Sequence, residues 1–154
     1  MSAEKRLEEL GIELPAAATP IGNYVTTVHT GNLIFTSGHG PGRGEGPLYK
    51  GQVGTDLTIE EGYASARQVG LCLLATLKNA LGDLDRVKRV VKVVGFVNSA
   101  PSFTEQPSVV NGVSDLLVEV FGDNGKHARS AVGMVQLPAA SPSKSSWSSK
   151  SNSN

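Results

Sequence analysis

Apolar residues recur at helical spacing in two long segments of the chain. In the first, residues 59–81, Thr58 and Glu61 form a capping box ahead of the repeat and Gly82 follows its last turn. The second, residues 107–121, opens with a proline, which the first turn of a helix tolerates. Each repeat makes one side of its helix apolar, so both helices are predicted to bury that side against a sheet.

Four other segments show the alternation and the β-branched residues that are typical of strands. They are residues 25–28 and 33–36, a predicted hairpin around a Thr-Gly-Asn turn, the valine-rich residues 86–99, and residues 130–137, which are expected to be buried. A short helix capped by Ser2 precedes them. This order of elements, β-β-α-β-α-β, predicts an α+β domain whose sheet is covered by two helices.

The valine-rich strand is apolar on both faces. Alternation places two sets of side chains on its opposite faces: Val87, Val91, Val93 and Val97 on one, and Val90, Val94 and Phe96 on the other. The helices can cover only one face of the sheet, so the second face needs another cover. A neighbouring copy of the chain would provide it, which favours a homo-oligomer.

Composition and charge narrow the class of protein. The 154 residues carry 14 basic and 14 acidic side chains, a balance that gives no electrostatic footprint for nucleic acid or an anionic membrane. No apolar run approaches the roughly 20 residues that cross a bilayer, and the charged N-terminal segment lacks the apolar centre of a signal peptide. The single cysteine, Cys72, cannot form an internal disulfide. We therefore expect one cytoplasmic domain without a membrane partner.

Few residues stand out as candidates for chemistry. The glycine-dense residues 38–54 lack the Lys-Ser/Thr of a phosphate-binding loop, the three histidines lack metal-ligand spacing, and Cys72 lies in mid-helix like a small buried hydrophobe. Arg129 differs, because it begins an apolar strand directly after a loop. Two interpretations are open for it: a surface ion pair, which composition alone favours, or a two-pronged clamp on a carboxylate.

A resemblance to a known family lies in three segments, "IGNYVTTVHTGNLIFTSGHGP", "VVNGVSDLLVEVFG" and "ARSAVGMVQLP". They resemble the Rid family, the reactive-intermediate deaminases formerly called YjgF proteins. The resemblance covers residues 20–138 in the family's order of elements, and the additional N-terminal helix is similar to a longer subgroup. It implies a chorismate-mutase-like fold of the bacillus type, with two helices on one face of the sheet. It also implies a homotrimer with ligand clefts between the subunits.

The resemblance implies a set of site residues as well. Arg129 corresponds to the arginine that holds the substrate carboxylate, Tyr24 to a tyrosine at the cleft, and Asn111 to an asparagine at the start of the second helix. Ser37 and Gly38 correspond to the opposite wall of the cleft. Each residue also has an ordinary structural interpretation: aromatic packing in the hairpin for Tyr24, turn chemistry for Ser37 and Gly38, and a helix-surface amide for Asn111.

The activity that the resemblance implies is hydrolysis of small reactive 2-imino or enamino acids to 2-keto acids and ammonia, with no metal or organic cofactor. Water attacks the C=N carbon while the arginine fixes the carboxylate. Two alternatives remain: a non-catalytic, regulatory binder of small carboxylate metabolites, and an endoribonuclease or translation inhibitor. The balanced charge and the lack of a basic, aromatic-lined groove count against a nucleic-acid partner.

The end of the chain departs from the family pattern. Position 131 is alanine where the deaminases carry cysteine, and Lys144 stands where the family has the water-binding glutamate of a V-x-I-E-I-E strand. We expect residues 1–140 to form the Rid-like domain and residues 141–154 to be a disordered polar tail. Plausible codons for residues 142–154, read in a shifted frame, encode V-E-V-E-L-V-V-E-V-E-F-E. The tail is therefore either a native polar segment or a frameshifted final strand, and the second case would impair activity.

Overall fold

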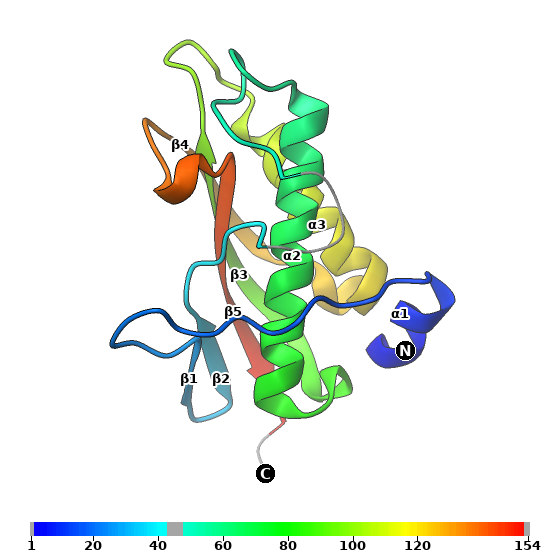
Figure 1. The fold of residues 1–154 in the computed structure, drawn as a ribbon. Coiled ribbons are helices and arrows are strands. Elements are labelled where there is room, and N and C mark those ends of the chain that lie inside the picture. The colour runs from blue at the N-terminus through cyan, green and yellow to red at the C-terminus, as the bar shows by residue number, and fades with distance from the viewer. Residues whose placement is uncertain (1, 43–47, 153–154) are drawn as a thin grey trace.

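The computed structural model describes residues 2–42 and 48–152 and shows a five-stranded sheet with its long helices on one face (Figure 1). The strands are β1 (Thr27–Thr30), β2 (Leu33–Thr36), β3 (Val87–Asn98), β4 (Ala128–Met134) and β5 (Ser143–Ser151). Their order across the sheet is β1-β2-β5-β3-β4. β3 and β4 are parallel, whereas the other neighbouring pairs are antiparallel. The predicted α+β class is confirmed.

The helices begin and end close to the positions that the sequence predicts. They are α1 (Ala3–Glu9), α2 (Ile59–Leu81) and α3 (Gln106–Phe121), with short 3-10 turns η1 (Leu84–Arg86), η2 (Gly122–Gly125) and η3 (Pro138–Ala140) between elements. At the start of α2, the Glu61 amide donates to the Thr58 hydroxyl at 3.2 Å and the Thr58 amide donates to the Glu61 carboxylate at 2.8 Å. Gly82 ends the helix with a φ of 80°, which favours glycine.

The core lies between the two long helices and the sheet. α2 and α3 approach closely at Gly112, where a Cβ atom would collide with the carbonyl oxygen of Tyr63. Fully buried side chains from both helices and from β3 fill the space: Leu73, Leu77, Val93, Val97, Leu116 and Leu117. Burial of this apolar surface is the main source of stability.

The alternation predicted for β3 is wrong in the first half of the strand. Its register with β5 shifts between Val87 and Arg89 and again between Val90 and Lys92. Such irregularities turn successive side chains out of strict alternation. Val90 is therefore fully buried, whereas Val91, which was predicted to share a face with the buried Val93 and Val97, is 39% exposed. Beyond the second shift the alternation is regular.

β4 is an edge strand and is less buried than predicted for residues 130–137. It ends at Met134, and a 3-10 turn at residues 138–140 leads away from it. On the face of the sheet that the helices leave uncovered, Phe35, Val132 and Met134 are exposed. This face is the one for which the sequence predicts a second cover.

The final strand corrects the prediction of a disordered tail for residues 143–151, while residues 153 and 154 of the predicted tail lie outside the described part of the chain. Ser143–Ser151 form β5, which lies between β2 and β3 and pairs with both. Backbone pairing does not depend on side chains, so a serine-rich segment can satisfy the amides and carbonyls that β2 and β3 would otherwise leave open. The side chains of every second residue from Ser143 to Ser151 are buried. Four serines and Trp147 therefore occupy positions on the core face.

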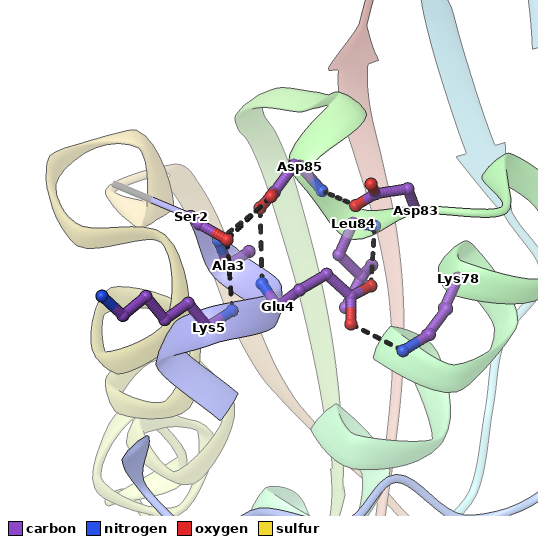
Figure 2. Close-up of polar contacts among 8 residues, drawn as sticks. All are labelled: Ser2, Ala3, Glu4, Lys5, Lys78, Asp83, Leu84 and Asp85. Atoms are coloured by element: carbon purple, nitrogen blue, oxygen red, sulfur yellow. Dashed lines mark hydrogen bonds and ion pairs between the residues drawn. The ribbon is translucent and has the colours of Figure 1, made fainter. Parts of the chain in front are cut away.

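The N-terminal helix is fastened to the turn between α2 and β3 (Figure 2). Asp85 of η1 accepts hydrogen bonds from the Ser2 hydroxyl at 2.7 Å and from the first amides of α1. In the other direction, Glu4 accepts from the Leu84 amide at 3.1 Å and pairs with Lys78 at 2.6 Å. A carboxylate at a helix N-terminus is favourable because it faces the unpaired amides. α1 is therefore a fixed part of the domain.

Candidate functional site

Arg129 lies on β4 beside Val93 and reaches helix α3. Its Nη1 atom donates to Oδ1 of Asn111 at 2.8 Å and to Oγ of Ser114 at 3.0 Å. Asn111 and Ser114 are three residues apart on α3 and so share one side of the helix. The structure thus brings together two of the predicted site residues, Arg129 and Asn111. Among the residues described, no carboxylate pairs with Arg129, so the ion-pair interpretation finds no partner.

His127 completes this cluster, two residues before Arg129 on the chain. Its Nε2 atom lies 3.0 Å from Oγ of Ser114, and its Nδ1 atom lies 2.6 Å from the carbonyl oxygen of Gly125. Burial lowers the pKa of His127 below 6.5; the bond to the Gly125 carbonyl opposes this shift, and the charge of Arg129 adds to it. The imidazole is therefore neutral at pH 7.

The other predicted site residues form a second cluster at the end of the hairpin. Tyr24, Ser37 and Gly38 line a cavity of about 510 Å³, together with His39 and Cys72. The Ser37 hydroxyl donates to the Val25 carbonyl at 2.6 Å, which fixes it in the cavity wall.

His39 supports this wall from within. The ring lies between the Ser37 carbonyl oxygen, 2.8 Å from Nδ1, and the Thr76 hydroxyl of α2, 2.8 Å from Nε2. Burial lowers the pKa of His39, and the nearby charge of Lys144 lowers it further, while the bond to Ser37 opposes both. A neutral His39 thus ties the Ser37-Gly38 wall to helix α2.

Lys144, which the resemblance sets at the position of a glutamate, lies against the same wall. Its Cε atom would be 2.6 Å from a Cβ atom at position 38, so only the lack of a side chain at Gly38 leaves room for it. Within the described part of the chain, no carboxylate forms an ion pair with Lys144. The wall therefore carries a cation, whereas the family resemblance predicts an anion there.

The two clusters lie at opposite edges of the sheet. Tyr24 precedes β1, and Ser37 follows β2, whereas Arg129 is on β4. β2, β5 and β3 lie between the edge strands β1 and β4, and Figure 1 shows the hairpin and β4 at separate places on the sheet. One copy of the chain therefore does not bring Arg129 and Asn111 together with Tyr24, Ser37 and Gly38.

Several neighbours of the predicted residues were missed from the sequence. Only two signals in the sequence could have identified Ser114 and His127. Ser114 is three residues after Asn111, and His127 is two residues before Arg129. Both are weak, because such spacings recur throughout any chain.

The described residues give no support for a metal site, a membrane-spanning helix or a cysteine nucleophile. These contain no group of three or more His, Cys, Asp or Glu side chains that could hold a metal ion, and no helix long and apolar enough to cross a membrane. Cys72 is buried as predicted, and burial raises the pKa of its thiol, so it is not poised as a nucleophile.

Known proteins with similar sequences and structures support the fold described above. Residues 4–143 match the family described as "YjgF/chorismate mutase-like, putative endoribonuclease". Protein TCP17 of Trypanosoma cruzi is 54% identical over 133 residues, which are 86% of this chain and 83% of that protein. The structure of Atu1372 from Agrobacterium tumefaciens is 40% identical, with a TM-score of 0.89 over 97% of this chain and 92% of that one.

A second solved structure is similar over the whole fold. It is a "putative endoribonuclease" from Shewanella oneidensis, 37% identical, with a TM-score of 0.92 over 97% of this chain and 99% of that one. These structural matches extend over nearly the whole chain, whereas the family match ends at the first residue of β5. Since the family match covers far more than half of the sequence, the chain belongs to the YjgF/chorismate mutase-like, or Rid-like, family.

Proposed function

We propose that this protein hydrolyses small 2-imino acids to 2-keto acids and ammonia without a cofactor, and that Arg129 binds the substrate carboxylate. The observation that carries the proposal is the arrangement of its guanidinium group. Both hydrogens of Nη1 are directed to Asn111 and Ser114, while none of the residues described accepts from Nε or Nη2. These two nitrogens form a parallel pair of donors that matches the two oxygens of a carboxylate.

The complete site is proposed to form between two copies of the chain. Arg129 and Asn111 of one copy would face Tyr24, Ser37 and Gly38 of the next, since the two clusters lie at opposite edges of one sheet. The exposed apolar side chains on the uncovered face of the sheet favour such an assembly. The family resemblance favours a homotrimer, which has three such clefts.

In this site the arginine would fix the acid so that water can add to the C=N carbon beside it. Addition gives a carbinolamine, and transfer of a proton to its nitrogen allows ammonia to leave and the ketone to form. Holding the carboxylate supplies the orientation on which the rate depends. An ammonium group has no lone pair with which to accept the proton of water, so Lys144 cannot replace a glutamate in that step. We therefore expect slow hydrolysis.

Lys144 also favours a second candidate function, the binding of small carboxylates without turnover. It places an additional positive charge beside the Ser37-Gly38 wall, and no described carboxylate neutralises it. A site with a cation on each wall would bind a 2-keto acid more readily than it would activate water.

An imine hydrolysis assay separates these functions. 2-Iminobutyrate is generated in the cuvette by an amino-acid oxidase, and release of ammonia is followed with and without the protein. Wild type is expected to accelerate release, Arg129→Lys to lose most of the acceleration, and Arg6→Lys, an arginine on α1 outside both clusters, to behave as wild type. Binding of 2-ketobutyrate is measured in parallel by calorimetry.

Each outcome selects one interpretation. Acceleration that depends on Arg129 supports the deaminase. Binding that depends on Arg129 without acceleration supports the carboxylate binder. If neither depends on Arg129, the clamp hypothesis is wrong, and cleavage of a labelled RNA would then test the activity in the family's name.

A further inference from the structure

We propose that Ser114 and His127 are positioning residues that hold the Arg129 guanidinium through a hydrogen-bond chain with a single direction. The inference rests on the proposed function only in that Arg129 binds a carboxylate. The hydrogen bonds run from β4 to α3 and back to the loop between η2 and β4, so they tie the start of β4 to helix α3.

The direction of the chain follows from its last acceptor. The Gly125 carbonyl can only accept, so Nδ1 of His127, 2.6 Å away, carries the hydrogen. In the neutral ring Nε2 is then a bare acceptor, and the Ser114 hydroxyl 3.0 Å away donates to it. With its hydrogen committed to His127, the Ser114 oxygen presents its lone pairs to Nη1 of Arg129 at 3.0 Å. Every group in the chain then has a partner.

This arrangement fixes the orientation of the guanidinium plane. Nη1 has two hydrogens, and Asn111 and Ser114 take one each. Two acceptors on one helix determine the position of Nη1 and the rotation of the guanidinium plane about the Cδ–Nε bond. The Nε and Nη2 donors therefore point in one direction. A single acceptor would leave the group free to rotate. Without His127, the Ser114 hydroxyl would lose its partner and could turn its hydrogen toward the arginine.

The surroundings of His127 agree with a neutral ring. Arg129 is the charged group that acts on it, and from α3 and η2 it meets a hydroxyl and a carbonyl rather than a carboxylate. The nearby Asp123 and Lys126 form an exposed ion pair with each other. A structural role alone does not require a ring nitrogen to face Ser114, since an apolar side chain would fill the same space.

The proposal is tested by a double-mutant cycle on 2-ketobutyrate binding, measured by calorimetry. Ser114→Ala and His127→Phe are each expected to weaken binding by about five- to tenfold, as loss of a hydrogen bond to a charged group would. Because both act through the same bond to Arg129, the double variant should bind no more weakly than Ser114→Ala. Ser114→Thr keeps the hydroxyl and is expected to restore most of the affinity. Ser108→Ala, on the same helix and outside the cluster, is the control.

A second measurement does not depend on a ligand. Nitrogen-15 NMR of the His127 ring in wild type should show a hydrogen on Nδ1 and a bare Nε2 whose signal shifts in Ser114→Ala. Additive losses in the cycle, wild-type binding by Ser114→Ala, or a hydrogen on Nε2 would each overturn the proposal. If wild type binds no 2-keto acid, the proposed function fails, and the ring nitrogens alone then decide for or against the hydrogen-bond chain.

Discussion

Replacement of Ser149 by valine should stabilise the protein. Ser149 lies in β5 between Ile34 and Val90, both fully buried, and is itself 1% exposed. Its hydroxyl oxygen has no hydrogen-bond partner among the residues described. An unsatisfied buried polar group costs about 1–3 kcal/mol, and each buried CH₂ contributes about 0.8 kcal/mol. After allowing for some crowding from the second methyl group, we expect Ser149→Val to raise the free energy of unfolding by about 2 kcal/mol.

Urea unfolding followed by circular dichroism measures this change, at one protein concentration because any assembly adds to apparent stability. The control is Ser102→Val, an exposed serine in the turn between β3 and α3. It should change stability by no more than about 0.5 kcal/mol. The melting temperature of Ser149→Val should rise by roughly 4–8 °C. If Ser149→Val is no more stable than Ser102→Val, the hydroxyl has a partner or the site has no room, and the reasoning fails.

Three further predictions concern the helices and the histidines. Gly112→Ala should cost about 3 kcal/mol, measured by urea unfolding, because its Cβ atom would collide with the Tyr63 carbonyl where α2 and α3 touch. Stability should fall as the pH drops below about 6.5, because the unfolded chain then protonates His39 and His127 whereas burial holds both folded pKa values lower; melting temperatures at pH 7.5 and 5.5 test this, and equal values would contradict it. Asp85→Ala should release α1, seen as faster proteolysis near the N-terminus while the melting temperature of the core changes little.

The predictable parts of the fold are those that short stretches of sequence determine. The ends of α2 follow from Thr58, Glu61 and Gly82, whose bonds and dihedral angles are local. The face of β3 is different, because its irregular pairing with β5 moves Val90 into the core and Val91 out of it. No residue within β3 predicts this shift in register, because the shift results from pairing with a strand about 60 residues later in the chain.

The candidate site also has residues that the sequence predicts and residues that only the structure reveals. The family resemblance identified Arg129 and Asn111. In the structure, Nη1 of Arg129 lies 2.8 Å from Oδ1 of Asn111. Ser114 and His127 were not predicted, because nothing local relates a serine in the middle of α3 to a histidine before β4. They meet only when the parallel pairing of β3 and β4 brings the start of β4 beside α3. The separation of the two clusters also requires the strand order, which the pattern of elements alone does not determine.

The fold does not explain why the buried strand β5 consists largely of serine. The frameshift hypothesis offers an explanation, and it makes a prediction about the nucleotide sequence of the gene. Residues 143, 145, 147, 149 and 151 are the buried positions of the strand. In the shifted frame of the plausible codons, these five positions read Val, Val, Leu, Val and Val, while Glu falls at 144, 146 and 150 on the less buried face. Any serine that is encoded by TCN reads as Phe, Leu, Ile or Val in this frame, so the serines at 143, 145, 149 and 151 can all conceal apolar residues. The family match also ends at residue 143, where β5 begins.

The frameshift hypothesis therefore predicts that the codons for residues 142–152 encode this alternating strand in the neighbouring frame, which sequencing the gene checks directly. A protein made from the restored frame should exceed the stability of Ser149→Val, because it gains all the apolar side chains on the core face at once. It should also hydrolyse imines faster, since a glutamate replaces Lys144 beside Gly38 and can accept a proton from water. Codons without V-E-V-E in the shifted frame would end the hypothesis, and β5 would then be a native serine strand. A restored protein that is stable but inactive would instead leave the carboxylate binder as the better account of the site.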